Sequence, residues 1–369
     1  MKSTAAVLFD SPGRYEVHEV DLDPPKEHEV LVRMVASGLC HSDVHYLVGD
    51  QATPLPMCPG HEGAGIVEDV GPGVTGLAPG DHVVASFIPS CGRCRYCAAG
   101  KSNLCTMGAL IQRGPQADGT YRMHLDGRDI YQFLMISTLS AWSVVSEQSL
   151  VKIPSDVPLE TVCLLGCGVG TGFGSAVNAA EVRPGDTVIV MGVGGVGINA
   201  VQGARMCGAR TIVAVDPVEF KQKAALDLGA THAVASMDEA MPLVTELTRG
   251  QMADAVILIP GVMYGELLAG AMALTGKGGT IVVTAVAPMM QMSASISLFE
   301  LAMYQKEVRG VIFGSGNPRF DIPNLLALYR SGQLKLDELI TQTYPLEGIN
   351  RGYQDMRDGK NIRGVITFS

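Results

Sequence analysis

The chain has 369 residues, enough for two domains and a large core, and its apolar (47%) and charged (17%) fractions are typical of a soluble globular protein. A formal net charge of −10 and the lack of basic runs argue against nucleic-acid binding. The N-terminal apolar stretch is interrupted at Asp10 and Pro12, which predicts a first strand rather than a signal peptide. Since no stretch approaches the roughly 18 apolar residues that cross a bilayer, we expect a cytoplasmic protein without a membrane or nucleic-acid partner.

Residues 1–165 are rich in glycine, proline and short runs typical of strands. Residues 29–37 (EVLVRMVAS) and 63–71 (GAGIVEDVG) are two such runs, and residues 71–81 (GPGVTGLAPGD) form a turn-rich stretch after them. This pattern predicts an all-β barrel or sandwich.

Strands and helices alternate in the second half of the chain. Strands are expected at 186–193, 211–216, 232–236, 253–261 and 278–287, and helices at 198–209, 219–230 and 239–250. Nearly continuous Val/Ile runs separated by helices predict a doubly wound parallel sheet, covered on both faces. The tail adds expected helices at 321–333 and 349–360 and a last strand at 364–368.

Residues 91–105 (CGRCRYCAAGKSNLC) place four cysteines in one short loop. They are Cys91, Cys94, Cys97 and Cys105, with the spacing C-x2-C-x2-C-x7-C. A reducing cytosol disfavours disulfides, and an iron–sulfur cluster commonly uses a shorter run or one that ends in Cys-Pro. Four thiolates this close together match a tetrahedral structural zinc site. Unligated thiols are the remaining alternative, and they would be open to oxidation.

A glycine-rich turn follows the first strand of the alternating half. Gly192, Gly194 and Gly197 fit the G-x-G-x-x-G pattern before an expected helix, and Asp216 ends the next strand. These features together favour a dinucleotide site over a plain turn with a capping aspartate. An acidic residue at 216 would repel a 2′-phosphate, so NAD is preferred over NADP, and Lys221 would reach the adenosine ribose.

A second group of metal-ligating residue types is scattered through the first half. Residues 38–50 (GLCHSDVHYLVGD) contain Cys40, residues 58–65 (CPGHEGAG) contain His61 and Glu62, and Cys167 lies further on. Two cysteines and a histidine can form a three-ligand zinc site with an open fourth position. Each of them alone is more often a core residue than a ligand.

Six stretches together make the chain resemble the zinc-dependent medium-chain alcohol dehydrogenases from end to end. They are residues 38–45 (GLCHSDVH), 59–65 (PGHEGAG), 80–97 (GDHVVASFIPSCGRCRYC), 166–178 (GCGVGTGFGSAVN), 193–204 (VGGVGINAVQGA) and 362–368 (IRGVITF). The resemblance implies a GroES-like, β-rich catalytic domain with a structural zinc lobe (1–168 and 313–369) and a Rossmann NAD-binding domain (169–312). It also implies two zinc ions per chain, one catalytic and one structural.

The resemblance assigns a role to individual residues. Cys40, His61 and Cys167 would bind the catalytic zinc with Glu62 beneath it, and Asp43 would orient His61. The cofactor would be held by His41, Thr171, Gly192, Gly194, Gly195, Val196, Gly197, Asp216, Lys221 and Arg363. Many relatives have an arginine where this chain has His41, which implies a weaker and pH-sensitive grip on the pyrophosphate. Phe87, Phe133 and Leu134 resemble substrate-pocket residues, for which plain core packing is the alternative.

The mechanism that the resemblance implies is oxidation of an alcohol to its aldehyde. Zinc would lower the pKa of the alcohol, and the zinc-bound alkoxide would transfer a hydride to NAD. The proton would leave through Ser42, the cofactor ribose and then His45.

A finer resemblance is to the actinobacterial nitrosodimethylaniline-dependent, or nicotinoprotein, alcohol dehydrogenases, carried by residues 191–209, 215–233 and 352–366. It implies tightly bound NAD that an external acceptor, such as a redox peptide, reoxidises. The alternatives are an ordinary NAD-exchanging alcohol dehydrogenase, an S-hydroxymethylglutathione (formaldehyde) dehydrogenase, and a non-catalytic relative, although no catalytic ligand is lost here. Relatives pair their Rossmann sheets edge to edge, so a homo-oligomer is expected.

Overall fold

A computed structural model describes residues 1–368, so only residue 369, the last of the predicted catalytic domain, lies outside the described residues. Contacts divide the chain into a first unit, Met1–Gly168 with the tail from Asn317, and a second unit, Val169–Gly316. Residues 313–316, placed in the catalytic domain from the sequence, fall in the second unit. There the Asn178 side chain donates to the Gly314 carbonyl oxygen at 3.1 Å.

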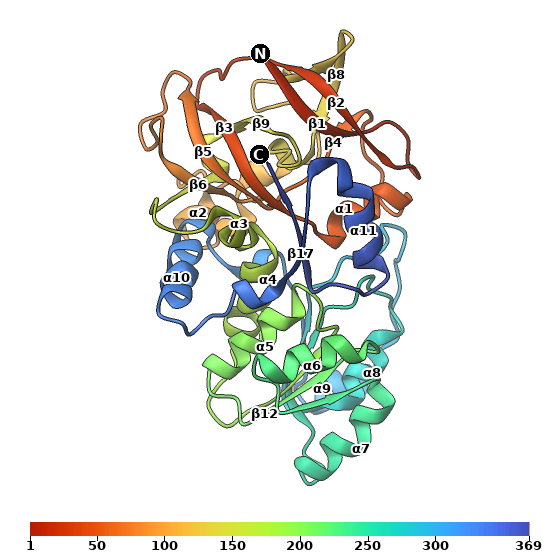
Figure 1. The fold of residues 1–369 in the computed structure, drawn as a ribbon. Coiled ribbons are helices and arrows are strands. Elements are labelled where there is room, and N and C mark those ends of the chain that lie inside the picture. Colours follow the sequence, from red (N-terminus) through yellow and green to blue (C-terminus); the bar gives the residue numbers. More distant parts are fainter. Residues whose placement is uncertain (369) are drawn as a thin grey trace. The chain divides into compact units, whose positions relative to one another are not determined.

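The first unit contains a closed barrel and a seven-stranded sheet (Figure 1). The barrel strands, in spatial order, are β1 (Lys2–Leu8), β2 (Tyr15–Leu22), β7 (Met123–Leu125), β8 (Arg128–Gln132) and β4 (Met57–Cys58). The sheet strands, in spatial order, are β10 (Leu150–Ile153), β6 (His82–Ala85), β5 (Gly63–Val70), β3 (Glu29–Gly38), β18 (Arg363–Thr367) and β17 (Ile340–Tyr344), and β9 (Trp142–Ser146) also pairs with β3. The predicted β-rich domain is therefore confirmed.

The C-terminal tail completes the sheet of the first unit. Strand β18 pairs antiparallel with the end of β3, where Val365 faces Gly38, and parallel with β17. The helices of this unit are α1 (His41–Val48), α2 (Arg95–Ala98), α3 (Leu159–Val162), α10 (Pro318–Arg330) and α11 (Ile349–Arg357). Its short 3₁₀ turns are Ser102–Leu104, Thr106–Ala109, Phe133–Met135, Glu147–Ser149, Cys163–Gly166, Asp337–Leu339 and Leu346–Gly348.

The second unit is built on a six-stranded, fully parallel sheet. Its strands, in spatial order, are β13 (His232–Val234), β12 (Thr211–Val215), β11 (Thr187–Met191), β14 (Ala253–Leu258), β15 (Thr275–Val283) and β16 (Glu307–Gly310). Its helices are α5 (Gly197–Met206), α6 (Glu219–Asp227), α7 (Met237–Leu247), α8 (Leu267–Leu274) and α9 (Leu298–Met303). Helix α4 (Gly168–Gly174) leads into this unit and continues as a π-helical turn, Ser175–Ala179, and a 3₁₀ turn covers Phe313–Ser315.

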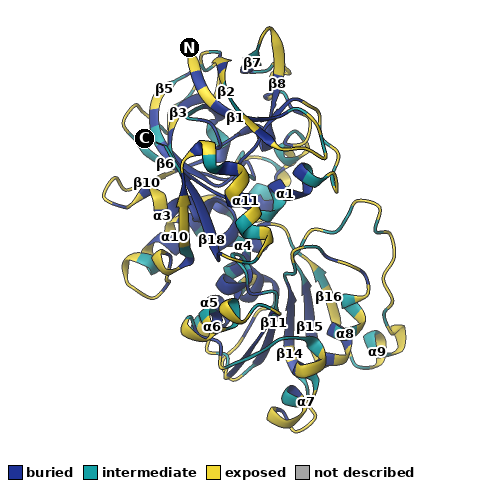
Figure 2. Ribbon diagram, turned by 45° about the vertical axis from the view of Figure 1, so that its right-hand side comes forward, coloured by how far each residue is buried: buried dark blue, intermediate teal, exposed yellow. Residues whose placement is uncertain are grey.

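Burial explains why the Val/Ile runs of the second unit form central strands. Val188, Val190 and Ile257 pack with α5 on one face of the sheet, whereas Ile189 and Val256 pack with α7 and α8 on the other. Figure 2 shows β11, β14 and β15 buried and the outer sides of the helices exposed. The predicted doubly wound sheet is confirmed. A strand that is covered on both faces of the sheet needs apolar side chains at nearly every position, which explains its continuous Val/Ile run.

Helix α7 begins two residues before the predicted start because of its N-terminal cap. The Ser236 hydroxyl accepts a hydrogen bond from the Glu239 backbone at 3.2 Å, and the Glu239 carboxylate accepts one from the Ala235 backbone at 3.0 Å. The first bond satisfies an N–H group that the first helical turn cannot satisfy internally, and the second ties the residue before the cap to the same turn.

Within residues 1–368, no single helix has both the length and the apolar character to span a membrane, although the bent pair Leu159–Gly166 and Gly168–Ala179 meets both criteria when taken together.

Candidate metal centres and nucleotide site

Four buried side chains converge in the first unit. The ligand atoms of Cys40, His61, Glu62 and Cys167 all lie within 4.8 Å of one another. Cys40 follows β3 and starts α1, His61 and Glu62 precede β5, and Cys167 follows a 3₁₀ turn. The fold thus gathers donors that are far apart in the sequence, as the resemblance implies.

The electrostatics of this cluster favour a bound cation. The hydrogen bond with Cys167 is the main cause that lowers the pKa of Cys40 well below its usual range, and the same bond raises the pKa of Cys167. Burial opposes a charge on His61, but the Asp43 carboxylate raises the pKa of that imidazole well above its usual value. The lowered pKa of Cys40 favours the thiolate, which is the form of cysteine that binds metals.

Glu62 lies against this cluster with an arginine behind it. Burial raises the pKa of Glu62 to about 7, although the Arg363 charge opposes that shift. The guanidinium of Arg363 donates to Glu62 Oε2 and to the Leu39 carbonyl oxygen. The other carboxylate oxygen, Glu62 Oε1, is buried without a hydrogen-bond partner among the described residues.

The donor set fits zinc. Two thiolates and an imidazole are the ligand types of three-ligand zinc sites with an open position. A carboxylate oxygen of Glu62 belongs to the same cluster, and its Oε1 atom has no hydrogen-bond partner among the described residues. The backbone at Gly38 packs directly against the Glu62–Arg363 pair and leaves no room for a side chain. A Cβ atom there would come 2.5 Å from Glu62 Oε2 and 2.9 Å from Arg363 Nη2.

Asp43 holds the outer side of His61. His61 Nδ1 lies 3.4 Å from Asp43 Oδ1 and 3.3 Å from Oδ2. The Gly60 backbone donates to Oδ1 at 3.0 Å. Because Nδ1 faces this carboxylate, Nε2 is the nitrogen left for a metal.

The predicted relay residues lie on α1, next to the cluster. The Ser42 hydroxyl is 3.6 Å from the sulfur of Cys40. His45 is 2% exposed, and its Nδ1 is 3.2 Å from the partly exposed Asp50 carboxylate. The rings of His41 and His45 meet edge to face with centroids 5.4 Å apart. Asp50 carried no sequence signal, because an acidic residue after a helix is common.

Two of the three predicted pocket residues flank His61, the predicted metal ligand. The His61 ring meets Phe87 and Phe133 edge to face, at centroid distances of 5.9 and 5.6 Å. Leu134 is buried and has a positive φ of 54°. The sequence did not single out Tyr46, whose ring packs against that of Phe133 with centroids 4.9 Å apart. Its position could have been expected, because Tyr46 follows Ser42 by four residues and therefore lies on the same face of the helix.

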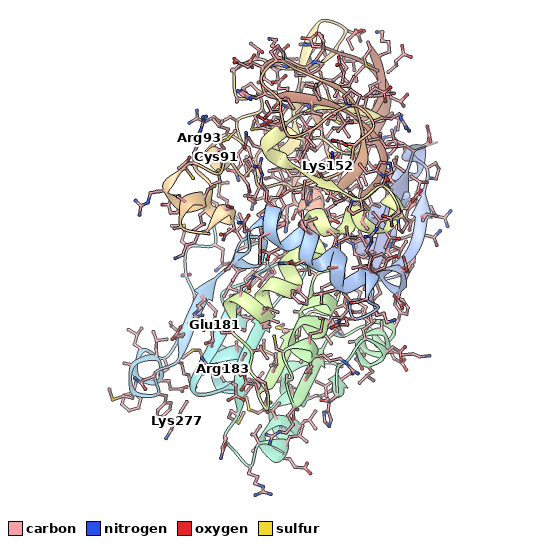
Figure 3. The ribbon with its side chains drawn as sticks, turned by 90° about the vertical axis from the view of Figure 1, so that its left-hand side faces the viewer. Cys91, Arg93, Lys152, Glu181, Arg183 and Lys277 are labelled. Carbon is pink, nitrogen blue, oxygen red and sulfur yellow. The ribbon has the colours of Figure 1, made fainter. Side chains whose placement is uncertain are left out.

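The four cysteines of residues 91–105 form a second cluster, with all four sulfurs within 4.8 Å of one another. Backbone N–H groups surround it: Cys94 donates to the Cys91 sulfur at 3.4 Å and Cys97 donates to the Cys94 sulfur at 3.5 Å. Such backbone donors lower the pKa of Cys94 to about 5. All nine cysteines are free thiols, so this set fits the structural zinc site rather than disulfides. Figure 3 labels Cys91 and Arg93 on this loop.

The glycine turn of the second unit is shaped as a dinucleotide site requires. Gly192 has a φ of 84°, and a Cβ atom there would overlap the Ile259 carbonyl. At Gly194, by contrast, a Cβ atom would have only the Lys221 ammonium within 4 Å, at 3.9 Å. The turn therefore leaves an open approach next to a cation, which fits a pyrophosphate at the start of α5.

Asp216 stabilises this turn directly. Its carboxylate accepts hydrogen bonds from the backbone of Val193 and Val218, both at 3.0 Å. Thr171, another predicted cofactor residue, has a buried hydroxyl that lacks a partner among residues 1–368. Arg363, predicted to bind pyrophosphate, belongs to the first unit, where its guanidinium contacts Glu62, as described above. The sequence could not reveal this contact between residues 301 positions apart.

The chain matches two family models. The alcohol dehydrogenase GroES-like domain matches residues 26–155, and the zinc-binding dehydrogenase domain matches residues 195–331. With the two clusters and the parallel sheet, these matches define the class: the chain belongs to the zinc-binding alcohol dehydrogenase family.

Individual relatives narrow the comparison. The chain is 52% identical to an NDMA-dependent alcohol dehydrogenase of Amycolatopsis methanolica, over the full length of both chains. It is 46% identical to alcohol dehydrogenase B of Mycobacterium tuberculosis, over 100% of this chain and 99% of that one. The predicted resemblance to the nitrosodimethylaniline-dependent group is thereby confirmed.

Solved structures agree. An alcohol dehydrogenase zinc-binding domain protein from Burkholderia ambifaria superposes with a TM-score of 0.94 at 34% identity, covering 100% of this chain and 99% of that one. Benzyl alcohol dehydrogenase from Acinetobacter calcoaceticus superposes with a TM-score of 0.93 at 32% identity, over the full length of both chains.

Proposed function

We propose that the chain is a zinc- and NAD-dependent alcohol dehydrogenase that oxidises an apolar alcohol to its aldehyde and keeps NAD bound through turnover. The convergence of Cys40, His61 and Cys167 carries the proposal. When bound, zinc supplies Lewis acidity toward the alcohol oxygen, and NAD supplies a two-electron acceptor.

The chain's own residues would prepare and hold the reactants. Cys40, His61 and Cys167 hold the metal, and Asp43 fixes the tautomer of His61. The Phe87 and Phe133 rings beside His61 favour an apolar substituent on the alcohol, since aromatic rings contribute apolar surface to small-molecule pockets.

Two residues of α1 would remove the proton of the alcohol. Ser42 and His45 are three residues apart and therefore lie on the same face of the helix. We assign to the Ser42 hydroxyl, beside the metal ligand Cys40, acceptance of the alcohol proton. His45 would pass a proton outward, in the direction of the Asp50 carboxylate, which lies 3.2 Å from its Nδ1.

On the second unit, Gly192 to Gly197 would receive the pyrophosphate, and Asp216 and Lys221 would contact the adenosine ribose. Thr171, with its unpartnered buried hydroxyl, would contact the nicotinamide. Arg363 and His41 remain the proposed pyrophosphate contacts of the first unit. An acid at 216 favours NAD over NADP.

The similarity to the NDMA-dependent enzyme supports NAD that stays bound and is reoxidised by an external acceptor. The test is extensive dialysis, denaturation, and quantification of the released nucleotide. We expect about one NAD per chain, and steady alcohol oxidation only when nitrosodimethylaniline is added, because residence requires very slow release.

An Asp216→Ala variant is the matched control, because it should lose the nucleotide while keeping both zinc ions. A nucleotide-free protein that reduces added NAD would instead establish ordinary exchange. Activity only with S-hydroxymethylglutathione would establish the formaldehyde dehydrogenase alternative, and two zincs without any dehydrogenation would refute the proposal.

We also propose a homo-oligomer. Strand β16 is an edge strand of the parallel sheet, and the nearby α9 exposes Leu298 (71%), Phe299 (66%) and Met303 (63%). An open edge beside exposed apolar side chains favours pairing with a second copy. Light scattering of the purified protein measures this directly, and Phe299→Glu should shift the mass toward the monomer.

A further inference from the structure

Tyr353, on the C-terminal helix α11, is buried in the same corner of the first unit as Asp43. Figures 1 and 2 show α11 beside α1. The Tyr353 ring packs on Tyr15 with centroids 5.3 Å apart, and the Tyr15 hydroxyl donates to the Asp43 backbone carbonyl at 3.1 Å. Asn350, one turn earlier on α11, binds the Tyr15 backbone twice, at 3.0 and 2.7 Å.

One hydrogen-bond donor and one acceptor in this corner make no hydrogen bond. Asp43 Oδ2 and the Tyr353 hydroxyl are both buried, and neither accepts or donates a hydrogen bond among residues 1–368, although Oδ2 lies 3.3 Å from His61 Nδ1. Tyr353 is 1% exposed and Asp43 is 0% exposed, so bulk water does not compensate them. Leaving a buried donor and a buried acceptor unsatisfied is costly in free energy.

Tyr15 links the two residues, because its ring packs on Tyr353 and its hydroxyl donates to the Asp43 backbone carbonyl. After burial itself, the Asp43 charge is the largest cause that raises the pKa of the Tyr353 hydroxyl well above its usual value. The raised pKa keeps the hydroxyl protonated at neutral pH, so that it is available as a donor. The two other titratable neighbours, the Tyr15 phenol and the Cys40 thiol, raise the pKa of Tyr353 in the same direction.

The Asp43 carboxylate needs such a donor. The Gly60 backbone fixes Oδ1, but His61 Nδ1 lies almost equally far from both oxygens, at 3.4 and 3.3 Å. The imidazole alone therefore does not determine how the carboxylate is rotated about its axis. A donor on Oδ2 would set this rotation and hence the orientation of the His61 ring.

We propose that Tyr353 is a positioning residue, whose hydroxyl donates to Asp43 Oδ2 in the metal-loaded protein and thereby holds His61 with Nδ1 protonated and Nε2 directed to the metal. The proposal rests on the proposed zinc site, and it adds a third member, from the last helix of the chain, to the pair of Asp43 and His61. Removal of groups that orient a metal ligand commonly costs 10- to 100-fold in metal affinity.

The test compares Tyr353→Phe with Tyr15→Phe, because both remove only a hydroxyl from stacked rings. Zinc release to a coloured chelator is followed in each variant, and the zinc of the four-cysteine loop serves as an internal reference. We expect Tyr353→Phe to release the zinc of the Cys40 site about 10-fold faster, at the low end of the range for such groups. Tyr15→Phe, whose hydroxyl serves a backbone carbonyl, should release it at the wild-type rate.

A double-mutant cycle separates positioning from packing. In an Asp43→Asn background, Tyr353→Phe should cause no further acceleration, since the hydroxyl acts through the carboxylate. Three results would overturn the proposal. Tyr353→Phe could release zinc from the Cys40 site at the wild-type rate, the two substitutions could have additive effects, or Tyr353→Phe could lose both zinc ions. A wild-type protein that holds two zinc ions but oxidises no alcohol would contradict the proposed function and leave this comparison intact.

Discussion

The two cysteine-containing clusters of the first unit are built in opposite ways. The four-cysteine loop takes all its donors from fifteen consecutive residues, 91–105, and its sulfurs accept hydrogen bonds from the backbone of the same loop. The cluster at Cys40 takes its donors from three distant segments, and every donor residue is buried. Local chain geometry therefore makes the first, whereas the sheet and its C-terminal strand make the second.

This difference predicts separate consequences for the two metals. A closed set of four thiolates contributes folding energy, whereas three ligands with an open position provide chemistry. Four experiments bear on this division, and they are ordered from the largest expected effect to the smallest.

Cys167→Ala should reduce the alcohol oxidation rate by about 10³-fold or more, because a Lewis acid contributes several kcal/mol to the transition state. Zinc content should fall from two to one per chain, and the thermal midpoint should change little. Turnover, elemental analysis and calorimetry measure these effects. A variant that keeps both zinc ions would remove Cys167 from the ligand set.

Cys94→Ala should instead act on stability. The thermal midpoint should fall by about 10 °C or more, since a loss of each 1 kcal/mol lowers it by about 2–4 °C for domains of 150–250 residues and a structural zinc site contributes several kcal/mol. The surviving folded fraction should retain zinc at the Cys40 site and the turnover rate per folded molecule. Equal loss of turnover per folded chain in Cys94→Ala and Cys167→Ala would eliminate the distinction between the clusters.

Ser42→Ala should lower turnover by about 10²-fold, at the lower limit for removal of a positioned proton-transfer group. His45→Gln should cost less, because buffer can replace a group at the outer end of the relay. Both variants should keep two zinc ions. Steady-state kinetics with and without small amine buffers distinguish the two positions, and an inactive His45→Gln enzyme that buffers do not rescue contradicts this order.

Paired glycine substitutions give the smallest effects. Gly38→Ala forces a methyl group against the Glu62–Arg363 pair and should cost about 1–3 kcal/mol, as overpacking does. Gly100→Ala meets open space at a φ of 76° and should cost about 1 kcal/mol through backbone conformation alone. Denaturant unfolding measures both; faster zinc release at the Cys40 site should follow only from Gly38→Ala.

The same contrast explains what could be predicted from the sequence. The four-cysteine loop follows from spacing alone, because its geometry is local. Cys40, His61 and Cys167 could be grouped only through the family resemblance, since no short-range pattern relates them. The pairing of Glu62 with Arg363 and the position of Tyr353 beside Asp43 depend on how the tail folds back, and a buried tyrosine in a helix looks like any core residue.

Fold prediction has a similar limit. The Val/Ile runs of β11, β12 and β14 gave correct strands because their burial on both faces requires apolar residues throughout. The ends of elements were less exact: α7 starts at its Ser236 cap, and β15 begins at Thr275, three residues before the predicted start. Hydrogen bonds of single residues determine where a helix or strand ends, and the hydrophobic pattern does not predict those bonds.

The pairing of β18 with β3 has a consequence for biosynthesis. During translation the ribosome releases β3, His61 and Cys167 long before β18, so the central sheet of the first unit lacks a strand until residues 363–367 have emerged. Arg363, the partner of Glu62, lies on that same late strand. A nascent chain stalled before residue 363 would therefore carry every predicted zinc ligand and still lack the strand and the arginine that complete the catalytic corner.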